Sequence, residues 1–419
     1  MMSVHNIIQP ILAGMTLSGL KEDYRNRIFN EYLPFWNKGG YDDKMGGFIC
    51  ELYDDGSVEK DEKYIWYQGR GIWVYSYLYS YFGKEASYLE IAQKSRNFLV
   101  DNMYLGYGRW LDSVNGKGKP VENTVGQGSN KDIYGSLFSA AGLIELYKAT
   151  GNNDDIDIAV DSIKEAVKIY EQAGYEGIEI PGIMETGLRT QGHSFVLIWI
   201  LTNLLSFYRD EYLEKVLHEH VDHIINHFWN PDYNIVNEYL KHDYSRIKGM
   251  DRVMMTGHSL EALWMVYQEA IRIKNLHLQK LCRERIRHLI NSAWDYSYGG
   301  LCTEKLTIPE NNGKPPVPDF SLKSMWAHTE LLIATMMIFE HTGEAWAAEW
   351  YERGRNYCHR YMTTSYGVWR QAVDRFGNDL SRPGISIYRK DNFHQIRYLM
   401  MNYLSLERII NNVQGSVKN

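Results

Sequence analysis

Gly257-His258-Ser259-Leu260-Glu261-Ala262-Leu263-Trp264-Met265-Val266 is apolar on nearly every side when it is placed on a helix of about 3.6 residues per turn. This pattern predicts a helix that is buried on most of its sides. Five more segments of the same kind begin near Trp66, Asp132, Gly192, Lys323 and Asp391. Their starts are spaced by roughly 60 to 70 residues, a period typical of stacked helical units rather than of independent domains.

A second kind of helix alternates with the first. These segments are amphipathic and rich in Lys and Glu, which is typical of a helix with one face in solvent. They span Ala86–Asn102, Ile156–Gln172, Glu211–Phe228, Leu276–Trp294 and Glu344–Arg360. Inner and outer helices together predict twelve helices along the chain.

Turn-rich segments with a Gly-aromatic signature precede several inner helices, at residues 45–48, 107–110, 298–301 and 366–369. Short alternating runs closed by Asp-Gly, Asn-Gly or Phe-Gly-Asn predict β-hairpins there. Each unit is then an outer helix, a hairpin and an inner helix. Six units would close an all-α (α/α)6 toroid of six helix pairs, a single domain over residues 1–419, with the hairpins forming the wall of a cleft.

The N-terminal stretch Ile7–Leu20 is apolar but interrupted by polar residues, and no basic residue precedes it as in a signal peptide. We therefore expect the first ~15 residues to be a frayed lead-in. No run approaches the ~20 apolar residues that a membrane-spanning helix needs, which excludes a membrane protein.

Composition excludes several other classes. The formal net charge of the 419 residues is −7 and Lys and Arg are dispersed, so nucleic acid is not an expected partner. The four cysteines lie far apart without a CxxC pair, which fits neither a disulfide framework nor a thiolate metal site and points to the cytoplasm. The 32 Tyr and 12 Trp residues suit a site that binds polar rings such as sugars.

Polar and titratable residues cluster at the starts of the apolar inner helices, where burial is costly unless they are paired or used. Helix N-termini favour anionic groups and neutral imidazoles, an environment suited to carbanion chemistry. The candidate site residues are Tyr67, Arg70, His193, His258, Glu261, Trp326, His328, Glu330, His394 and Arg397.

Two histidines of this set could invert a sugar carbon. Epimerisation at C2 needs one base to remove a proton and a second group to return it on the opposite face, and histidine can do both near neutral pH. We assign these roles to His258 and His394. Arg70 or Arg397 could stabilise the oxyanion, and Glu261 and Glu330 could orient imidazoles or bind hydroxyls. This chemistry requires neither a metal nor a nicotinamide.

Four sequence blocks resemble the N-acylglucosamine 2-epimerase family, which also contains cellobiose and mannose 2-epimerases and aldose-ketose isomerases. Residues 67–73 are similar to its Gln-Gly-Arg-x-x-Trp block, and residues 257–264 to its Pro-Gly-His-x-x-Glu-Ala-x-Trp block. Residues 326–330 and 393–397 are similar to its Trp-Pro-His-x-Glu and Phe-His-x-x-Arg blocks. The resemblance implies an (α/α)6 fold and a paired-histidine mechanism, with Arg70, Glu330 and Arg397 as binding or polarising groups.

Within the family, the last two blocks look most like the enzymes that interconvert N-acetylglucosamine and N-acetylmannosamine. Thr256 and Ala327 replace prolines, and His193 is a feature of the cellobiose epimerase and isomerase branches, so those activities are the alternatives. The resemblance also suggests a homodimer and ATP as an allosteric effector. However, the only Gly-Lys-rich segment, Gly116-Lys117-Gly118-Lys119, lacks the spacing of a phosphate-binding loop.

Other interpretations compete with the epimerase. His218, His220, His223 and His227 could hold a metal, although an outer helix predicts a solvated face. Glu261 and Glu330 could serve a glycoside hydrolase, which would leave the histidines unexplained. The segment Trp346–Tyr351 could form the face of an interaction protein or a dimer. Finally, a Gly-His-Ser motif such as Gly257-His258-Ser259 could have no role beyond capping a helix. Arg70 could form a core ion pair with Glu261 or Glu330.

Overall fold

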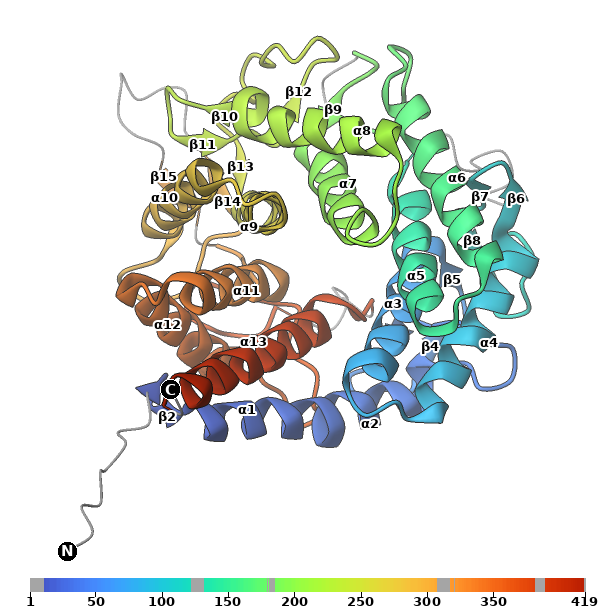
Figure 1. Cartoon of the computed structure of the whole chain (residues 1–419), viewed down its shortest axis with the longest axis horizontal. Coiled ribbons are helices and arrows are strands. Elements are labelled where there is room, and N and C mark those ends of the chain that lie inside the picture. Colours follow the sequence, from blue (N-terminus) through green and yellow to red (C-terminus); the bar gives the residue numbers. More distant parts are fainter. Residues whose placement is uncertain are drawn as a thin grey trace, which may run out of the picture.

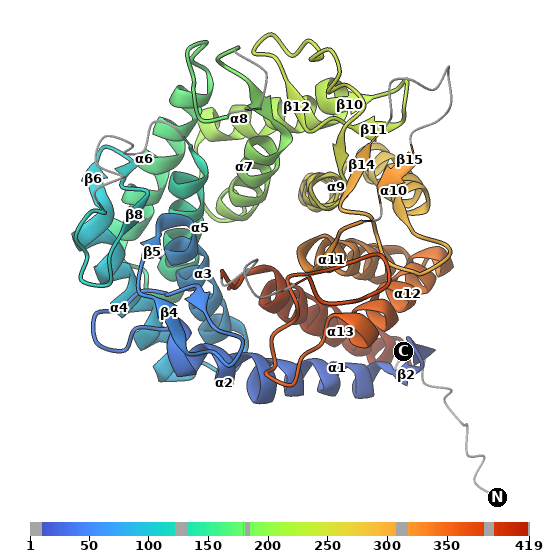
Figure 2. The same cartoon turned by 180° about the vertical axis from the view of Figure 1, so that it is seen from behind.

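The computed structural model describes residues 11–121, 132–178, 180, 185–306, 317–319, 321–380 and 389–417. Its helices form a closed ring in which an inner layer is surrounded by an outer one (Figures 1 and 2). This is the predicted (α/α)6 toroid. The inner helices are α3 Ile65–Tyr81, α5 Tyr134–Thr150, α7 Gln191–Leu204, α9 Thr256–Arg272, α11 Met325–Thr342 and α13 His394–Val417.

The outer layer alternates with the inner one along the chain. Its first member is a continuous helical stretch made of α1 Leu17–Asn26, η1 Arg27–Tyr32, α2 Leu33–Phe35 and η2 Trp36–Gly40. The others are α4 Ala86–Met103, α6 Asn153–Tyr170, α8 Glu211–Asp222 continued by η4 His223–Phe228, α10 Leu276–Ala293 and α12 Ala345–Tyr361. The inner helices are apolar all round because they touch both neighbours, an outer helix and the centre of the ring.

The structure describes the end of the predicted lead-in, from Ile11 onward. Strands β1 Ile11–Leu12 and β2 Met15–Thr16 form a hairpin, and α1 begins at Leu17. The Thr16 hydroxyl accepts a hydrogen bond from the Gly19 N–H (3.1 Å), so this polar residue starts a helix instead of interrupting one. Leu17, Leu20 and Tyr24 are buried, which makes this stretch part of the core.

Two of the predicted hairpins are present, and each is formed by two strands of the same unit. Strands β3 Glu51–Leu52 and β4 Val58–Lys60 pair around Asp55-Gly56, and β6 Tyr104–Gly106 and β7 Arg109–Trp110 pair around Tyr107-Gly108. A third pair, β10 Trp229–Asn230 with β11 Ile235–Val236, has the same place in its unit. The segment 366–369 forms a turn without a strand.

The remaining ladders join neighbouring units, which the hairpin pattern did not predict. A strand that leads into one inner helix pairs with a strand from the next unit. These pairs are β5 Lys63–Tyr64 with β8 Ser113–Val114, β9 Arg189–Thr190 with β12 Tyr239–Leu240, β13 Met254–Met255 with β14 Glu304–Leu306, and β16 Lys323–Ser324 with β17 Ala372–Val373; β14 also pairs with β15 Val317–Asp319. A bridge between Glu51 and Arg389 joins the first and last units. The ladders therefore tie the rim of the ring together on the side shown in Figure 2.

Two fully buried lysines fix this rim at equivalent places. The Lys63 ammonium donates to the Gly46 carbonyl (2.7 Å) and to Asp42 (2.8 Å). Lys323 likewise donates to the Gly299 carbonyl and to Asp295 (3.2 Å). Burial lowers the pKa of both lysines, although the paired aspartates oppose this effect. Each lysine thus holds a Gly-Gly turn against the start of an inner helix.

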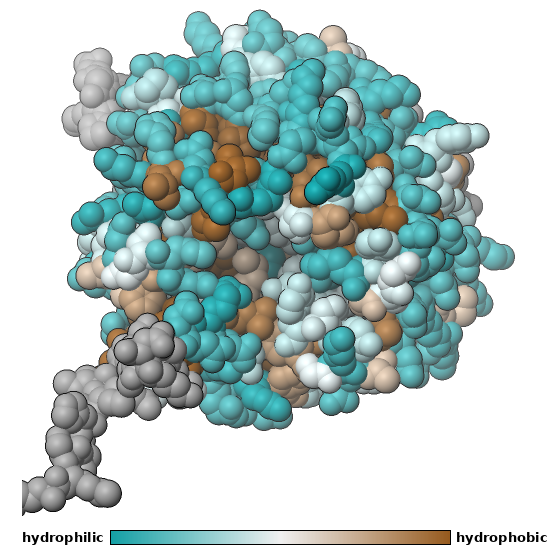
Figure 3. All heavy atoms as spheres, viewed as in Figure 1, coloured by the Kyte–Doolittle hydropathy of each residue, from teal (hydrophilic) through white to brown (hydrophobic). Residues whose placement is uncertain are grey.

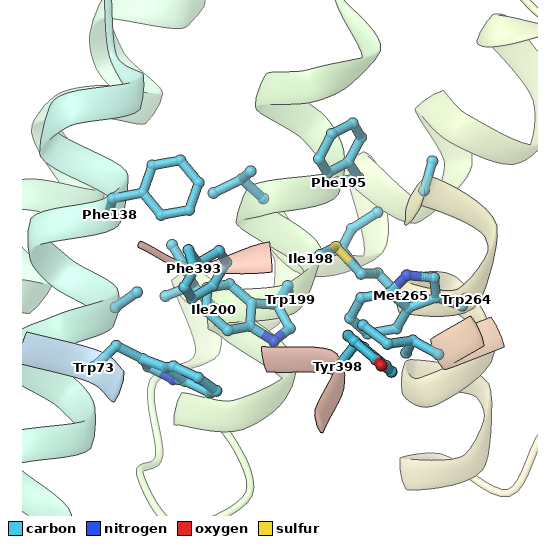
Figure 4. Packing of buried hydrophobic residues seen from close by; sticks show 14 of the residues in the cluster. Trp73, Phe138, Phe195, Ile198, Trp199, Ile200, Trp264, Met265, Phe393 and Tyr398 are labelled. Atoms are coloured by element: carbon cyan, nitrogen blue, oxygen red, sulfur yellow. The ribbon is translucent and has the colours of Figure 1, made fainter. Parts of the chain in front are cut away.

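Aromatic side chains fill the centre of the ring. Trp73, Trp199 and Phe393 pack together with ring centroids 5.3 to 5.7 Å apart, and Trp264 and Tyr398 lie nearby (Figure 4). Such pairs add to the free energy of burying large apolar surfaces. The toroid is therefore closed in the middle.

The face of the molecule in Figure 3 is mostly polar, with apolar side chains showing between polar ones near its centre. No described helix combines the length and hydropathy that crossing a bilayer requires. The segment Trp346–Tyr351, considered as an interaction face, is largely internal. Ala347, Trp350 and Tyr351 are all buried because α12 turns them toward the core.

Helices α3 and α5 meet at two glycines, which yields a test of the packing. A Cβ on Gly142 would lie 2.4 Å from the Gly69 carbonyl oxygen, and backbone cannot move aside cheaply. Alanine normally favours a helix by about 1 kcal/mol over glycine. We expect Gly142→Ala nevertheless to lower the free energy of unfolding by about 1–3 kcal/mol, measured by urea denaturation. The control is Gly174→Ala, whose Cβ would have no neighbour within 4 Å; equal stability of both variants would contradict this account.

Candidate active site

The inner helices carry their polar residues in one register. The first position is occupied by Tyr67, Gly135, His193, His258, Ala327 and His394 in chain order. The second position, three residues further along each helix, is occupied by Arg70, Phe138, Val196, Glu261, Glu330 and Arg397. Residues three apart share a helix face, so both positions point to the same region of the ring.

A cavity of about 320 Å³ lies at the starts of these helices. His258 and His394 both line it, with Trp326 between them; the Trp326 ring centroid lies 4.9 Å from that of His258 and 6.1 Å from that of His394. The two imidazoles therefore share one small space. The other described lining residues are Trp66, Arg70, Tyr134, Phe138, Phe195, Val196 and Glu261.

Asp391 holds His394 in place. One carboxylate oxygen accepts hydrogen bonds from the backbone N–H groups of Phe393 (2.8 Å) and His394 (2.6 Å), which caps α13. The other oxygen lies 2.7 Å from Nδ1 of His394. Although burial opposes it, the positive charges of His394 and Arg70 and the hydrogen bonds from His394 hold the pKa of Asp391 well below its usual value. Asp391 is thus an anion that fixes this imidazole.

Glu238 has the same role at His258. Its Oε1 lies 2.9 Å from Nδ1 of His258, and it also accepts hydrogen bonds from the Thr190 hydroxyl (3.1 Å) and the Gln191 side chain (2.9 Å). Burial favours the neutral form of His258, but Glu238, with the charges of Glu261 and Glu330, raises its pKa above the usual value. Glu238, in the loop before β12, therefore orients the His258 imidazole and favours its protonated form.

These contacts assign the ring nitrogens. A carboxylate can only accept, so Nδ1 of each histidine carries a proton and donates it. Among the described residues, no hydrogen bond is formed to Nε2 of either His258 or His394. Each histidine consequently offers Nε2 as the nitrogen that can take or give a proton.

Arg397 forms a buried ion cluster beneath the cavity. Its Nη2 donates to Glu261 (2.8 Å) and to Glu330 (2.5 Å), and the Trp264 indole donates to the second oxygen of Glu330 (2.9 Å). Burial would raise the pKa of Glu261, but Arg397 and both histidines lower it; burial and the charge of Glu261 raise the pKa of Glu330. Since one guanidinium nitrogen holds both carboxylates, Glu261 and Glu330 do not face each other across a substrate as in a glycoside hydrolase.

Arg397 also occupies the place that a metal ion would need. The ligand atoms of Glu261, Glu330 and His394 lie within 4.8 Å of one another, but the guanidinium already binds both carboxylates. These residues therefore do not fit a divalent cation.

The predicted solvated face of four histidines on α8 and η4 is wrong for His220. This residue is buried, and its Nδ1 bonds the Ser194 hydroxyl (3.0 Å). His223 contacts the Tyr244 hydroxyl (2.8 Å), and burial lowers its pKa to about 4. The outer helix turns this side toward α7, so His220 is a core residue.

Arg70 is not the core ion pair with Glu261 or Glu330 that we considered. Its guanidinium lies over the Phe138 ring (4.1 Å to the centroid) and makes one long ion pair with Asp391 (3.6 Å). Its Nε is buried and has no hydrogen-bond partner. Arg70 therefore lines the cavity and retains a buried donor without a hydrogen-bond partner.

Five predicted site residues do not line the cavity, and two of them, Glu330 and Arg397, belong to the ion cluster beneath it. Tyr67 is buried. His193 lies behind Tyr134 (4.5 Å between ring centroids), with its Nε2 3.3 Å from Asp132. His328 accepts from the Leu301 N–H (2.9 Å) and donates to the Ser324 carbonyl, and burial lowers its pKa to about 4.

The role of His328 follows from the register. Gln68 and Gln395 occupy the same position in their helices, and each bonds the backbone of a neighbouring turn, at Phe48 and at Trp369. His328 makes the equivalent bond to Leu301, so it supports the rim.

A family model described as N-acylglucosamine 2-epimerase (GlcNAc 2-epimerase) matches residues 46–389. The chain belongs to the N-acylglucosamine 2-epimerase family. It is therefore an enzyme of the isomerase class acting on carbohydrates. Arg70 and His258 lie within the matched residues, whereas His394 and Arg397 follow them.

Curated members of the family are similar over most of their length. The N-acylglucosamine 2-epimerase of Rattus norvegicus is 26% identical over 356 residues, which are 80% of this chain and 80% of that protein. The cellobiose 2-epimerase of Bacteroides fragilis is 22% identical over 375 residues, 84% of this chain and 90% of that protein. The solved structure of cellobiose 2-epimerase from Bacillus thermoamylovorans, 21% identical, covers 92% of this chain and 99% of its own with a TM-score of 0.75, which confirms the fold.

The sequence missed several residues of this epimerase-family site. Asp391, three residues before His394, could have been found as a helix cap. Glu238 gave no signal, because it lies in the loop between β11 and β12, 20 residues before His258. Phe138 and Val196 were hidden in apolar helices, where any hydrophobic residue fits the pattern.

Replacing Arg397 tests the ion cluster. Arg397→Met should leave two buried carboxylates without a cation and lower the free energy of unfolding by about 3–5 kcal/mol. Their pKa values in the folded state would then exceed those in the unfolded state, so the loss should be larger at pH 8 than at pH 5. Denaturation at both pH values measures it. Lys38→Met, which breaks an exposed pair with Asp55, is the control and should leave the free energy of unfolding nearly unchanged; a pH-independent loss in Arg397→Met would contradict the account.

Proposed function

We propose that this enzyme is a sugar 2-epimerase that interconverts N-acetylglucosamine and N-acetylmannosamine by proton transfer at C2 between His258 and His394. One observation carries the proposal: two imidazoles, each held by a carboxylate on Nδ1, line one cavity with Nε2 free. The similarity to named N-acylglucosamine 2-epimerases supports the choice of sugar.

The proposed reaction starts from the open-chain aldehyde. Nε2 of one neutral histidine removes the C2 proton, and the electron pair of the C–H bond moves to C1–C2 while the carbonyl oxygen becomes an oxyanion. The protonated second histidine then gives its Nε2 proton to the opposite face of C2, and the carbonyl forms again. The raised pKa of His258 supports its role as the protonated partner at the outset.

The remaining residues would stabilise the intermediate. Arg70 lines the cavity, has a donor without a hydrogen-bond partner, and would bind the developing oxyanion. Glu261 lines the cavity beside His258, and Arg397 holds it in place. Its negative charge would favour the protonated form of His258. The reaction has no net oxidation or reduction, so we propose that it needs no nicotinamide or metal.

Regulation and assembly stay predictions. Residues 116–119 form a turn in which the Asn115 side chain accepts from the Lys117 and Lys119 N–H groups, unlike a phosphate-binding loop, so any effect of ATP would act elsewhere. All four cysteines are free and buried, which supports a reducing, cytoplasmic location. A homodimer is expected from the family resemblance, and analytical ultracentrifugation would test it.

The two histidines can be tested by proton exchange. NMR in D2O with N-acetylglucosamine, N-acetylmannosamine, mannose, glucose and cellobiose should show deuterium at C2 and an aldose product for the N-acetylated pair. His258→Asn and His394→Asn should each lower kcat by about 10²–10⁴-fold, because each removes one proton-transfer group. The exposed His218→Asn is the control. A ketose product would favour the aldose-ketose isomerase, and exchange with cellobiose alone would favour the cellobiose epimerase.

The role of Glu238 can be tested by a pH profile. Glu238→Gln keeps the shape of the side chain but removes the charge that raises the pKa of His258. His258 should then lose its proton at lower pH, and the limb of kcat/KM that requires protonated His258 should move to lower pH. Glu171→Gln, on an exposed carboxylate, is the matched control. A uniform loss of activity without a shifted limb would mean that Glu238 is only structural.

A further inference from the structure

The second position of the inner helices divides the cavity into two unlike halves. Arg70 and Glu261 place charges in the cavity from α3 and α9, whereas Glu330 and Arg397 on α11 and α13 belong to the ion cluster beneath it. The adjacent helices α5 and α7 carry Phe138 and Val196 instead. We call Phe138, Phe195 and Val196 the apolar wall; all three line the cavity and are at most 5% exposed.

The apolar wall lies next to the groups that would act on C2. The Phe195 ring centroid is 5.4 Å from that of His258, and the Phe138 centroid is 4.1 Å from the Arg70 guanidinium carbon. In Figure 4 Phe138 and Phe195 lie at one edge of the aromatic cluster, away from Trp73 and Tyr398. The apolar wall thus extends from His258 to Arg70.

The chemistry of a C2 intermediate limits what can face this wall. When C2 becomes planar between the two imidazoles, its three remaining substituents lie in the plane between them. The C1 oxyanion needs the Arg70 donors, and the rest of the sugar chain carries hydroxyls that lose free energy if buried without partners. An acyl group on the C2 nitrogen ends in an alkyl group, which gains from burial against apolar side chains.

We propose that the apolar wall is an acyl subsite, which binds the alkyl end of the acylamino group on C2 and sets the length of acyl chain that the enzyme accepts. This inference rests on the proposed function. Val196 is the side chain that would limit the length, because it is the smallest member of the wall and occupies the second position on α7.

The test uses a series of N-acylated mannosamines with acetyl, propanoyl and glycolyl groups. Val196→Ala removes two methyl groups from the wall and should raise the ratio of kcat/KM for propanoyl over acetyl by roughly 10-fold, the usual effect of one methylene in an apolar pocket. Val196→Thr keeps the shape and adds a hydroxyl, so it should raise the ratio for glycolyl over acetyl.

Val216→Ala is the matched control. Val216 has the same 2% exposure as Val196 but lies on the outer helix α8, so its truncation should leave every substrate ratio unchanged. Because the readout is a ratio, a general loss of stability cannot imitate it, and Val196→Thr covers the case in which the alanine variant does not fold.

Two outcomes would overturn the inference, and they are distinguishable. If the wild type exchanges C2 of N-acetylmannosamine but both Val196 variants keep the wild-type ratios, the acyl subsite is wrong and the epimerase stands. If the wild type acts on mannose or cellobiose and not on any N-acylated sugar, the proposed function fails and the acyl subsite fails with it.

Discussion

The buried guanidinium of Arg397 is the constraint on which the rest of the site depends. It binds Glu261 from α9 and Glu330 from α11, and it belongs to α13 itself. Each of these helices carries a cavity residue three or four positions earlier: His258, Trp326 and His394. One buried cation therefore fixes the relative positions of three helices, and with them the two imidazoles. Removing it would leave two buried carboxylates without a cation. The resulting loss in the free energy of unfolding is far larger than the net contribution of an intact buried ion pair.

The repeat uses equivalent positions for unlike purposes. Gln68, His328 and Gln395 follow the first position in their helices, and each bonds the backbone of a turn at the rim. The first position itself is a histidine three times, yet only His258 and His394 line the cavity. The role of a histidine in this fold therefore depends on its surroundings. His193 shares its residue type and helix position with His258 and His394 but does not line the cavity.

The cavity is polar on one side and apolar on the other because its helices come from different units of one repeat. The polar side is formed by α3, α9 and α13. It holds His258 and His394, each bound through Nδ1 to a carboxylate, and Arg70, whose Nε has no hydrogen-bond partner. Aromatic and branched side chains face them from α5 and α7. Such an asymmetric space suits a substrate that combines an anion-forming carbon with an apolar substituent.

The sequence alone determined the helices, their alternation and the placement of His258, Glu261 and His394 at inner-helix starts, because periodicity and capping are local properties of the chain. Tertiary structure decided the rest. The pairing of His258 with Glu238 joins a helix to a loop 20 residues earlier in the chain, and the ladders between units depend on strands from different repeats. His328 supports the rim because the N–H group that it binds belongs to Leu301, 27 residues earlier in the chain. No local pattern encodes such contacts, which form only when the ring closes.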